Sequence, residues 1–414
     1  MNSKPHKILL LAPQPFFAKR GTPFNVKAIA TALAKGGYEV DLLVYPQGES
    51  IELPENVNLI RCPGLPGIKN VPAGPSWAKF FLDFPFSLKA FALALRGKYS
   101  VVHGVEEGAI IAGVLSAILR TPYVFDMDSC MPEQLESAGV LKSKNLSSIV
   151  RNIESYFVKK ATAVLTVCQA LTDKAKEISP NSLVYQIEDF PLDSANEVNQ
   201  SFVENLRKQF KLEGRSVILY TGNFSTYQGI DLLLESLKSL KELSSEAAKK
   251  ACLLLVGGGD APEQLKHYQE LVGKMGLADD VVFAGQQPPE SMGSFMALSD
   301  ALVSPRTVGG NTPLKIYSYM AAERPIIATD ISSHTQVLNF DNSYLAAPDS
   351  NSFSKAMEQA LSETFENLSV KQARVAQAKK LVDTKYSKKE FERRVVELYQ
   401  NILGEQSSAY SKAA

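Results

Sequence analysis

Residues 216–259 read SVILYTGNFSTYQGIDLLLESLKSLKELSSEAAKKACLLLVGGG, and the order of patterns within this stretch decides the fold class. Residues 216–221 form a short apolar run with β-branched side chains, which is typical of a buried strand. Apolar residues at helical spacing follow over 229–242, and a second apolar run at 252–256 ends in three glycines. A strand, a helix and a strand in this order predict an α/β fold with a parallel sheet.

The first half of the chain shows the same alternation. Strand-like apolar runs lie at 7–13, 38–45, 57–62, 101–104, 123–127 and 163–167. Helical patterns lie between them at 24–35, 108–119 and 146–160. We therefore predict two Rossmann-like, doubly wound domains, the first over 1–195 and the second over 196–384. Two such domains side by side would face a cleft at the carboxyl ends of their strands, where ligands bind in α/β folds.

The composition limits the classes of function. The 414 residues include 44 Lys plus Arg and 44 Asp plus Glu, so the formal net charge is +0. A protein that binds nucleic acid by neutralising phosphates normally has a basic excess, and we therefore predict no nucleic-acid partner. The 4 cysteines and 4 histidines are scattered and form no CxxC pair. This spacing predicts neither a disulfide framework nor a protein-built metal site.

Hydropathy gives an expectation for location. The apolar run that follows MNSKPHK is too short for the core of a secretory signal. The longest uncharged apolar run, 108–119, is well below the ~20 residues that a membrane span needs. We therefore expect a cytoplasmic protein.

Several segments, in order along the chain, resemble glycosyltransferase family 4. Residues 220–231 (YTGNFSTYQGID) resemble the start of the second domain of that family, and 255–259 (LVGGG) and 281–285 (VVFAG) resemble its VGxG and VxFxG segments. Residues 304–321 and 325–329 resemble its donor-binding loop, helix and strand. The resemblance covers essentially the whole chain and implies a GT-B fold. It also implies retaining transfer of a sugar from a nucleotide-diphosphate donor, with no bound metal and no separate cofactor.

The resemblance also implies roles for the domains. The domain at 1–195 would lie on the acceptor side, and the domain at 196–384 would bind the nucleotide sugar. Residues 385–405 form a strongly amphipathic helical pattern. In this family such a helix often packs back on the first domain, and we expect the same here.

This sequence departs from the family at several expected donor contacts. The family usually has an Arg and a Lys in the first loop of its second domain, where this chain has Asn223 and Gln228. The paired glutamates of the family fall on Gly310 and Ser318. Asp128 stands near the place where many members have a catalytic histidine. The resemblance thus predicts a divergent branch that lacks the usual paired glutamates.

A glycine turn before a helix offers a second source of phosphate contacts. Gly309 and Gly310 permit close approach of the backbone, and Thr312 and Pro313 suit the cap and first position of a helix predicted over 313–322. Amides at a helix N-terminus bind anions. Lys315 in the first turn opposes the helix dipole by ~0.3–1 kcal/mol, and a bound anion would remove that conflict.

We predict that Arg306 and Lys315 supply the charge that is missing at Asn223 and Gln228. The alternatives are that Lys315 extends into solvent and that Arg306 forms a structural ion pair. The complete set of predicted donor-binding residues is Gly21, Thr22, Gly222, Asn223, Gln228, Arg306, Gly309, Gly310, Asn311, Thr312, Lys315 and Ser318.

Three of these positions, Gly21, Thr22 and Ser318, also have ordinary structural alternatives. Gly21 and Thr22 are expected on the loop after the first strand, where an amide can point at the phosphate or the glycine can simply form a turn. Ser318 can reach a ribose hydroxyl or be a plain helical serine.

The candidate catalytic residues are Asp128, Asp126 and His103. Asp126 and Asp128 lie at the carboxyl end of a predicted strand, where the chemistry of α/β enzymes usually occurs. Helix capping would account for one of them but not readily for both. His103 ends the preceding strand beside Glu106 and Glu107, and a buried, hydrogen-bonded histidine is the alternative.

Aromatic and basic residues gather in one segment: Trp77, Phe80, Phe81, Phe84, Phe86 and Phe91 with Lys79, Lys89, Arg96 and Lys98. Such a segment can place a helix on a membrane surface, which would suit a lipid-linked acceptor and peripheral contact with the inner face of the membrane. The alternative is that these aromatic side chains fill the core or line an acceptor channel.

The leading hypothesis is therefore a retaining glycosyltransferase with a nucleotide-diphosphate sugar donor and a glycan or lipid-linked acceptor. A GT-B protein that has lost turnover and acts as a binding or scaffold protein is the first alternative, because several expected donor contacts are missing. A sugar-nucleotide epimerase of the same architecture is the second.

Overall fold

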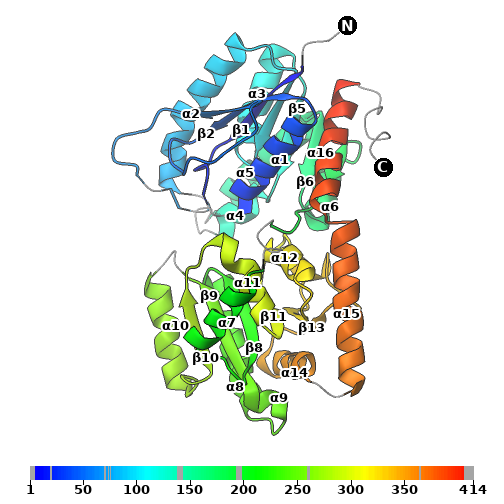
Figure 1. The fold of residues 1–414 in the computed structure, drawn as a ribbon. Coiled ribbons are helices and arrows are strands. Elements are labelled where there is room, and N and C mark those ends of the chain that lie inside the picture. The colour runs from blue at the N-terminus through cyan, green and yellow to red at the C-terminus, as the bar shows by residue number, and fades with distance from the viewer. Residues whose placement is uncertain are drawn as a thin grey trace. The chain divides into compact units, whose positions relative to one another are not determined.

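The computed structural model describes residues 5–18, 21–69, 71–72, 74, 76–137, 143–192, 198–258, 262–362 and 365–404. The chain forms two compact units, coloured along the chain in Figure 1. The N-terminal unit comprises Met1–Glu188 with Lys389–Ala414, and the C-terminal unit comprises Asp189–Lys388. The division thus falls at Glu188 and Asp189, within seven residues of the expected boundary at 195.

The N-terminal unit is built on a parallel sheet with the order β3-β2-β1-β4-β5-β6-β7. Its strands are β1 (Lys7–Ala12), β2 (Glu39–Val44), β3 (Val57–Arg61), β4 (Val101–Val105), β5 (Tyr123–Met127), β6 (Ala163–Thr166) and β7 (Val184–Gln186). The strand order changes direction between β1 and β4, as in doubly wound folds.

The helices of this unit are α1 (Gly21–Lys35), α2 (Trp77–Arg96), α3 (Gly108–Leu119), α4 (Met131–Ser137), α5 (Lys144–Lys160), α6 (Gln169–Ile178) and α16 (Lys388–Leu403). Helices α2, α3, α5 and α6 share one apolar core with alternate residues of the strands, such as Leu9 and Leu11 of β1. These helices therefore cover one face of the sheet, since side chains of a strand alternate between its faces.

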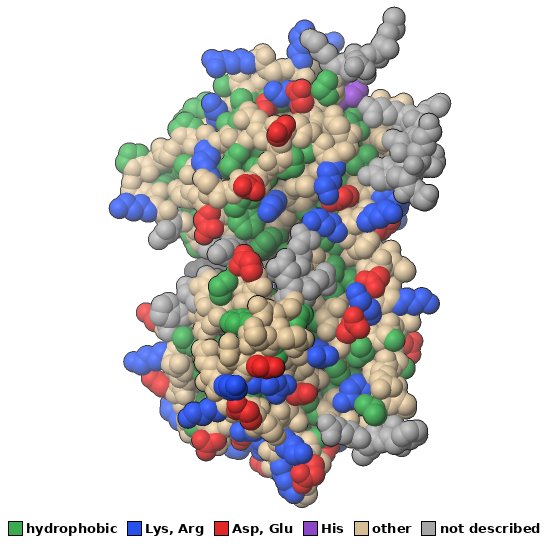
Figure 2. Space-filling model, in the orientation of Figure 1, with side chains coloured by type: hydrophobic (Ala, Val, Ile, Leu, Met, Phe, Trp, Pro, Cys, Tyr) green, Lys and Arg blue, Asp and Glu red, His purple; other side chains and the backbone are tan. Residues whose placement is uncertain are grey.

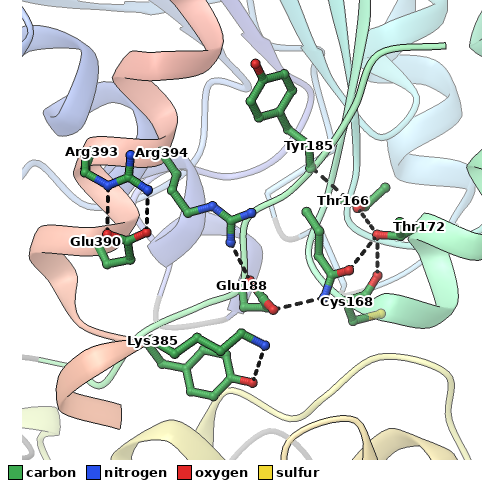
Figure 3. A network of polar contacts seen from close by, with 11 residues as sticks. Thr166, Cys168, Thr172, Tyr185, Glu188, Lys385, Glu390, Arg393 and Arg394 are labelled. Atoms are coloured by element: carbon green, nitrogen blue, oxygen red, sulfur yellow. Dashed lines mark hydrogen bonds and ion pairs between the residues drawn. The ribbon is translucent and has the colours of Figure 1, made fainter. Parts of the chain in front are cut away.

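Polar contacts fix the C-terminal helix α16 on the N-terminal unit (Figure 3). Arg394 donates to Glu188 at 3.0 Å, and Gln186 donates to the other oxygen of Glu188 at 2.9 Å. Thr172 of α6 donates to Gln186 at 3.1 Å, while Arg393 pairs with Glu390 within α16. The network joins α16 to the end of β7 and to α6, which are far from it in sequence.

The C-terminal unit has a second parallel sheet, of order β10-β9-β8-β11-β12-β13. Its strands are β8 (Ser216–Gly222), β9 (Ala251–Gly257), β10 (Val281–Gly285), β11 (Ala301–Ser304), β12 (Ile326–Thr329) and β13 (Tyr344–Ala346). Its helices are α7 (Gln200–Gln209), α8 (Ile230–Lys241), α9 (Glu246–Lys250), α10 (Pro262–Met275), α11 (Met292–Leu298), α12 (Lys315–Ala321), α13 (Ser332–Thr335), α14 (Ser350–Leu361) and α15 (Phe365–Thr384). Separate apolar cores lie on the two faces of this sheet.

The prediction of two doubly wound α/β domains is confirmed, and several boundaries are corrected. Helix α1 begins at Gly21 instead of residue 24, and α12 begins at Lys315 instead of residue 313. The aromatic segment is only partly buried in the core. Phe86 is buried in the core, whereas Trp77 and Phe80 are exposed to solvent. Among the described residues, no helix has both the length and the apolar content to cross a bilayer.

Candidate active site

Glycines lie at the carboxyl ends of the central strands of the C-terminal sheet. Gly222 ends β8 with a φ of 139°, and Gly257 ends β9 with a φ of 127°. A Cβ on Gly257 would lie 1.9 Å from the carbonyl oxygen of Gly222, so these strand ends approach only because Gly257 lacks a side chain. The strand order changes direction between β8 and β11, and ligands of open α/β sheets bind at such points.

Gly257→Ala is expected to lower the free energy of unfolding of the C-terminal unit by about 2–3 kcal/mol, because the added methyl group overlaps the backbone of Gly222. Gly276→Ala is the matched control. Gly276 also has a positive φ, of 72°, but has no atom within 4 Å of the added Cβ. Its cost should be about 1 kcal/mol in urea denaturation, and equal costs for the two variants would contradict the steric explanation.

Lys315, the first residue of α12, lies beside Gly222 at the end of β8. Its Nζ is 3.4 Å from Oε1 of Gln228 and 4.0 Å from the ring centroid of Tyr220. A Cβ on Gly222 would lie 3.2 Å from the same amine, so the Gly222 backbone runs close beside it. The amine of Lys315 thus lies beside Gln228, at which the resemblance expects a lysine.

Arg306 follows β11, and its guanidinium group donates hydrogen bonds to the backbone of the turn at 308–311. Nε donates to the carbonyl oxygen of Val308 at 2.8 Å, and Nη1 donates to that of Asn311 at 3.1 Å. Gly309 has a φ of 136°, which favours glycine, and a Cβ there would lie 2.4 Å from Nη2 of Arg306. Gln336 supports the same turn by donating to the carbonyl oxygen of Gly310 at 2.9 Å. Arg306 therefore supports the turn through two backbone carbonyl groups, and its guanidinium carbon also lies 5.2 Å from the ring centroid of Tyr227.

Arg306 and Lys315 have no acidic ion-pair partner in the part of the chain that the structure describes. Burial, together with the charge of Arg306, lowers the pKa of Lys315 to about 7. Burial also lowers the pKa of Arg306. Positive charge held in a desolvated place without a partner favours the binding of an anion.

The start of α12 differs from the expected capped helix. Leu314 occupies the position before the helix, and the amide of Ile316 bonds to the carbonyl oxygen of Pro313 at 2.9 Å. Thr312 is buried, and its Oγ1 has no hydrogen-bond partner among the described residues. The predicted cap is therefore wrong, because the chain turns once before Lys315 and carries the Thr312 hydroxyl away from the helix amides.

Other predicted donor residues have structural partners. Asn223 accepts from the amide of Ser225 at 3.2 Å, which closes a local turn after β8. Ser318 accepts from the amide of Leu192 at 3.3 Å and so holds the segment that enters the C-terminal unit. The hydroxyl of Ser318 accepts this bond and can still donate one, whereas the side-chain oxygen of Asn223 is bonded within its own loop.

Gly21 and Thr22 lie in the first turn of α1 instead of on a preceding loop. Gly21 is exposed, and nothing lies within 4 Å of a Cβ built on it. The roles of Gly21 and Thr22 toward a donor stay predictions.

His103 and Asp126 lie in a buried polar network of the N-terminal unit. His103 is 0% exposed, with Nδ1 2.7 Å from the Tyr399 hydroxyl and Nε2 3.0 Å from Oδ2 of Asp126. Asp126 is also fully buried, and its Oδ1 has no hydrogen-bond partner among the described residues. Both side chains are enclosed within the N-terminal unit, where they connect β4 and β5 to α16. These contacts favour the structural alternative for His103, and the catalytic role of both residues stays a prediction.

Asp128 remains at the carboxyl end of β5. It is buried, and its Oδ1 accepts from Nδ2 of Asn25 on α1 at 3.4 Å. Oδ1 of Asn25 has no hydrogen-bond partner among the described residues. A carboxylate and an amide at the edge of the sheet are suited to bind hydroxyl groups of a sugar.

Sequence reasoning missed an ionic cluster at the carboxyl end of β4. Glu107 forms an ion pair with Lys79 of α2, and burial raises the pKa of Glu107 to about 7. Glu106 has a φ of 49° and accepts from Ser129 at 3.0 Å and from Gln134 at 3.1 Å. A signal was present, because two consecutive glutamates follow a strand at its ligand-binding end. Among the described residues, no group of His, Cys, Asp and Glu has an arrangement that could hold a metal ion.

Two protein-family models match this chain. The model described as glycosyl transferase 4-like domain matches residues 21–182, and the model described as glycosyl transferases group 1 matches residues 215–363. The chain carries the two domains of a glycosyltransferase. Gly222, Gly257, Arg306 and Lys315 lie within the group 1 match, whereas Asp128 lies within the 4-like match.

Curated proteins that are similar to this chain match it over part of its length. Alpha-D-kanosaminyltransferase of Streptomyces kanamyceticus is 22% identical over 251 residues, which are 59% of this chain and 62% of that protein. Lipopolysaccharide 1,2-N-acetylglucosaminetransferase of Salmonella typhimurium is 30% identical over 133 residues, which are 30% of this chain and 33% of that protein. The chain thus spans less than two thirds of the length of these relatives.

Solved structures share the fold over nearly the whole chain. Sucrose-phosphate synthase from Thermosynechococcus elongatus has a TM-score of 0.74 at 19% identity, over 96% of this chain and 99% of that chain. HepE of Anabaena, solved in complex with UDP, has a TM-score of 0.73 at 15% identity, over 96% and 100% of the two chains. The predicted GT-B type of two Rossmann-like domains is confirmed.

Proposed function

We propose that this protein is a glycosyltransferase that uses a nucleotide-diphosphate sugar as donor. The observation that carries the proposal is the position of Lys315. Its amine lies beside Gln228 and Gly222, shares its surroundings with Arg306 and has no carboxylate counter-ion among the described residues. A pyrophosphate group would supply the missing negative charge. The glycosyltransferase family models and the UDP complex of HepE support this donor class.

The two cations would then act on the leaving group. Negative charge grows on the diphosphate as its bond to the sugar breaks, and fixed positive groups lower the energy of that transition state. Lys315 and the Nη2 group of Arg306 would bind the phosphate oxygens, and the Thr312 hydroxyl would donate a further hydrogen bond. They would replace the charge of the Arg and Lys that the family usually has at positions 223 and 228. Retention of configuration is proposed from the family resemblance.

Asp128 is the proposed residue that orients or deprotonates the reacting hydroxyl in the N-terminal domain. Asp128→Asn is expected to lower the rate of sugar transfer by about a hundredfold or more while the affinity for nucleotide stays unchanged. Asp173→Asn, an exposed position on α6, is the matched control and should keep its full rate. An equal loss of nucleotide affinity in Asp128→Asn would contradict this role.

We propose a glycan or lipid-linked acceptor. The Salmonella relative is named for lipopolysaccharide, which supports an acceptor of this kind. A lipid-linked acceptor would bring the protein from the cytoplasm to the inner face of a membrane.

A GT-B protein without turnover is the second candidate, because Gly310 and Ser318 stand where the family has its paired glutamates. Melting temperatures with a panel of UDP-, GDP- and ADP-sugars test donor binding, and mass spectrometry of the incubated donor and added lipid extract tests transfer. The proposal expects one donor to raise the melting temperature and to appear on an acceptor. Stabilisation without transfer would favour the scaffold protein, and an isomerised donor would favour an epimerase. No stabilisation by any donor would contradict the proposal.

A further inference from the structure

Helix α2 is apolar on two opposite faces. Leu82, Phe86, Ala90 and Ala94 recur every fourth residue and are buried in the core of the N-terminal unit. The opposite stripe is in solvent and also recurs at helical spacing; its members are Trp77, Phe80, Phe81, Phe84, Leu88 and Leu95. Trp77 is 78% exposed and Phe84 is 70% exposed, values far from those of a packed aromatic ring. A helix that is apolar on both faces needs a second apolar environment.

The neighbouring helices continue this stripe. Helix α2 packs beside α3, and α3 packs beside α5, on the same face of the sheet. Ile118 of α3 is exposed, and α5 exposes Ile149, Ile153 and Tyr156 at helical spacing. We name this region the α2–α3–α5 surface. It is too extended to be explained by single exposed side chains.

The exposed charged residues on the same helices have one sign. The acidic residues of α2, α3 and α5 are Asp83 and Glu154, and both are turned inward. Asp83 accepts from the Tyr45 hydroxyl, and Glu154 is 1% exposed and accepts from the amide of Met131. The exposed charged residues of these helices are all basic: Arg96, Lys144, Arg151, Lys159 and Lys160. Arg151 lies 3.5 Å from the exposed carboxylate of Glu136 on α4, so Arg96, Lys144, Lys159 and Lys160 carry the charge argument. Figure 2 shows hydrophobic and basic side chains side by side over the part of the N-terminal unit where α2 runs.

We propose that the α2–α3–α5 surface docks on a lipid bilayer that contains anionic lipids. Aromatic and aliphatic side chains would enter the boundary between headgroups and acyl chains, and the basic side chains would pair with anionic headgroups. The absence of exposed acidic residues on these helices is the charge complementarity that such a surface requires. A second copy of this chain fits less well, because a two-fold interface would place this basic surface against itself.

Flotation of the purified full-length protein with vesicles tests the proposal without any sugar donor, so its failure is distinct from failure of the proposed activity. The protein should float with vesicles of phosphatidylcholine and phosphatidylglycerol and much less with phosphatidylcholine alone. The double variant Phe80→Ser and Phe84→Ser should bind the anionic vesicles at least about tenfold more weakly, because two rings no longer enter the bilayer. The double variant Lys159→Glu and Lys160→Glu should lose the preference for anionic vesicles.

Phe340→Ser is the matched control, since Phe340 is an exposed aromatic residue of the C-terminal unit, and it should bind vesicles as the wild type does. Circular dichroism melts of all variants should match the wild type, because the replaced side chains are in solvent. The proposal is overturned if the wild type does not bind anionic vesicles, or if the phenylalanine variant binds them equally well. It is also overturned if sedimentation shows a dimer that this variant dissociates while vesicle binding is absent.

Discussion

Lys315→Met is expected to raise the melting temperature of the ligand-free protein and, at the same time, to weaken binding of UDP or GDP by about a hundredfold. The wild-type amine is desolvated beside Arg306 without a carboxylate among the described residues, so its charge destabilises the free protein. Methionine keeps the length of the side chain and its contact with Tyr220 without that charge. A substitution that raises stability and weakens binding indicates that the original residue serves ligand binding at a cost in stability.

The same residue predicts how stability depends on pH. Its pKa is lowered to about 7 in the folded protein from an ordinary value of 10.5, so the folded chain binds fewer protons than the unfolded chain between these values. The contribution of Lys315 to the free energy of unfolding therefore rises with pH across this window. Lys315→Met should lack that rise, whereas Lys238→Met, at an exposed position on α8, should keep it. A ligand-free Lys315→Met protein less stable than wild type would contradict the account.

His103→Ala is expected to lower the free energy of unfolding of the N-terminal unit by about 3–5 kcal/mol. The substitution leaves the carboxylate of Asp126 buried without its histidine and removes the partner of the Tyr399 hydroxyl. Urea denaturation followed by circular dichroism measures the loss. His267→Ala, at an exposed position on α10, is the control and should cost little.

This second prediction also separates a structural histidine from a catalytic one. A catalytic role would, in addition to the loss of stability, lower the rate of transfer per folded molecule. An unchanged urea midpoint for His103→Ala would contradict the structural role.

The sequence predicted the strands well because their signal is local. Short apolar runs separated by helical patterns determine a parallel sheet, and residues at strand ends then gather at one edge. For that reason the sequence pattern alone places Lys315 and Arg306 near the donor loop. Lys315 meets Gln228 as expected of a replacement for the missing charge.

The sequence could not predict contacts between distant residues or the direction in which side chains point. The partner of His103 is Tyr399, which is 296 residues away, and no local pattern connects them. The guanidinium group of Arg306 donates to carbonyl oxygens of its own loop, in which Gly309 has a positive φ. No local sequence pattern predicts this direction. The sequence showed one aromatic cluster at 77–91, and only the structure tells that Phe86 is buried while Trp77 and Phe80 are exposed.

Calorimetric titration with UDP and GDP, in buffers of different ionisation enthalpy, tests the central claim most directly. If Arg306 and Lys315 bind a diphosphate, binding should take up a proton at Lys315, and the affinity should fall roughly tenfold per pH unit above about pH 7. Lys315→Met should bind weakly at every pH and take up no proton. Binding by the wild type with no proton uptake and no dependence on pH, or no binding of either nucleotide, would contradict the claim.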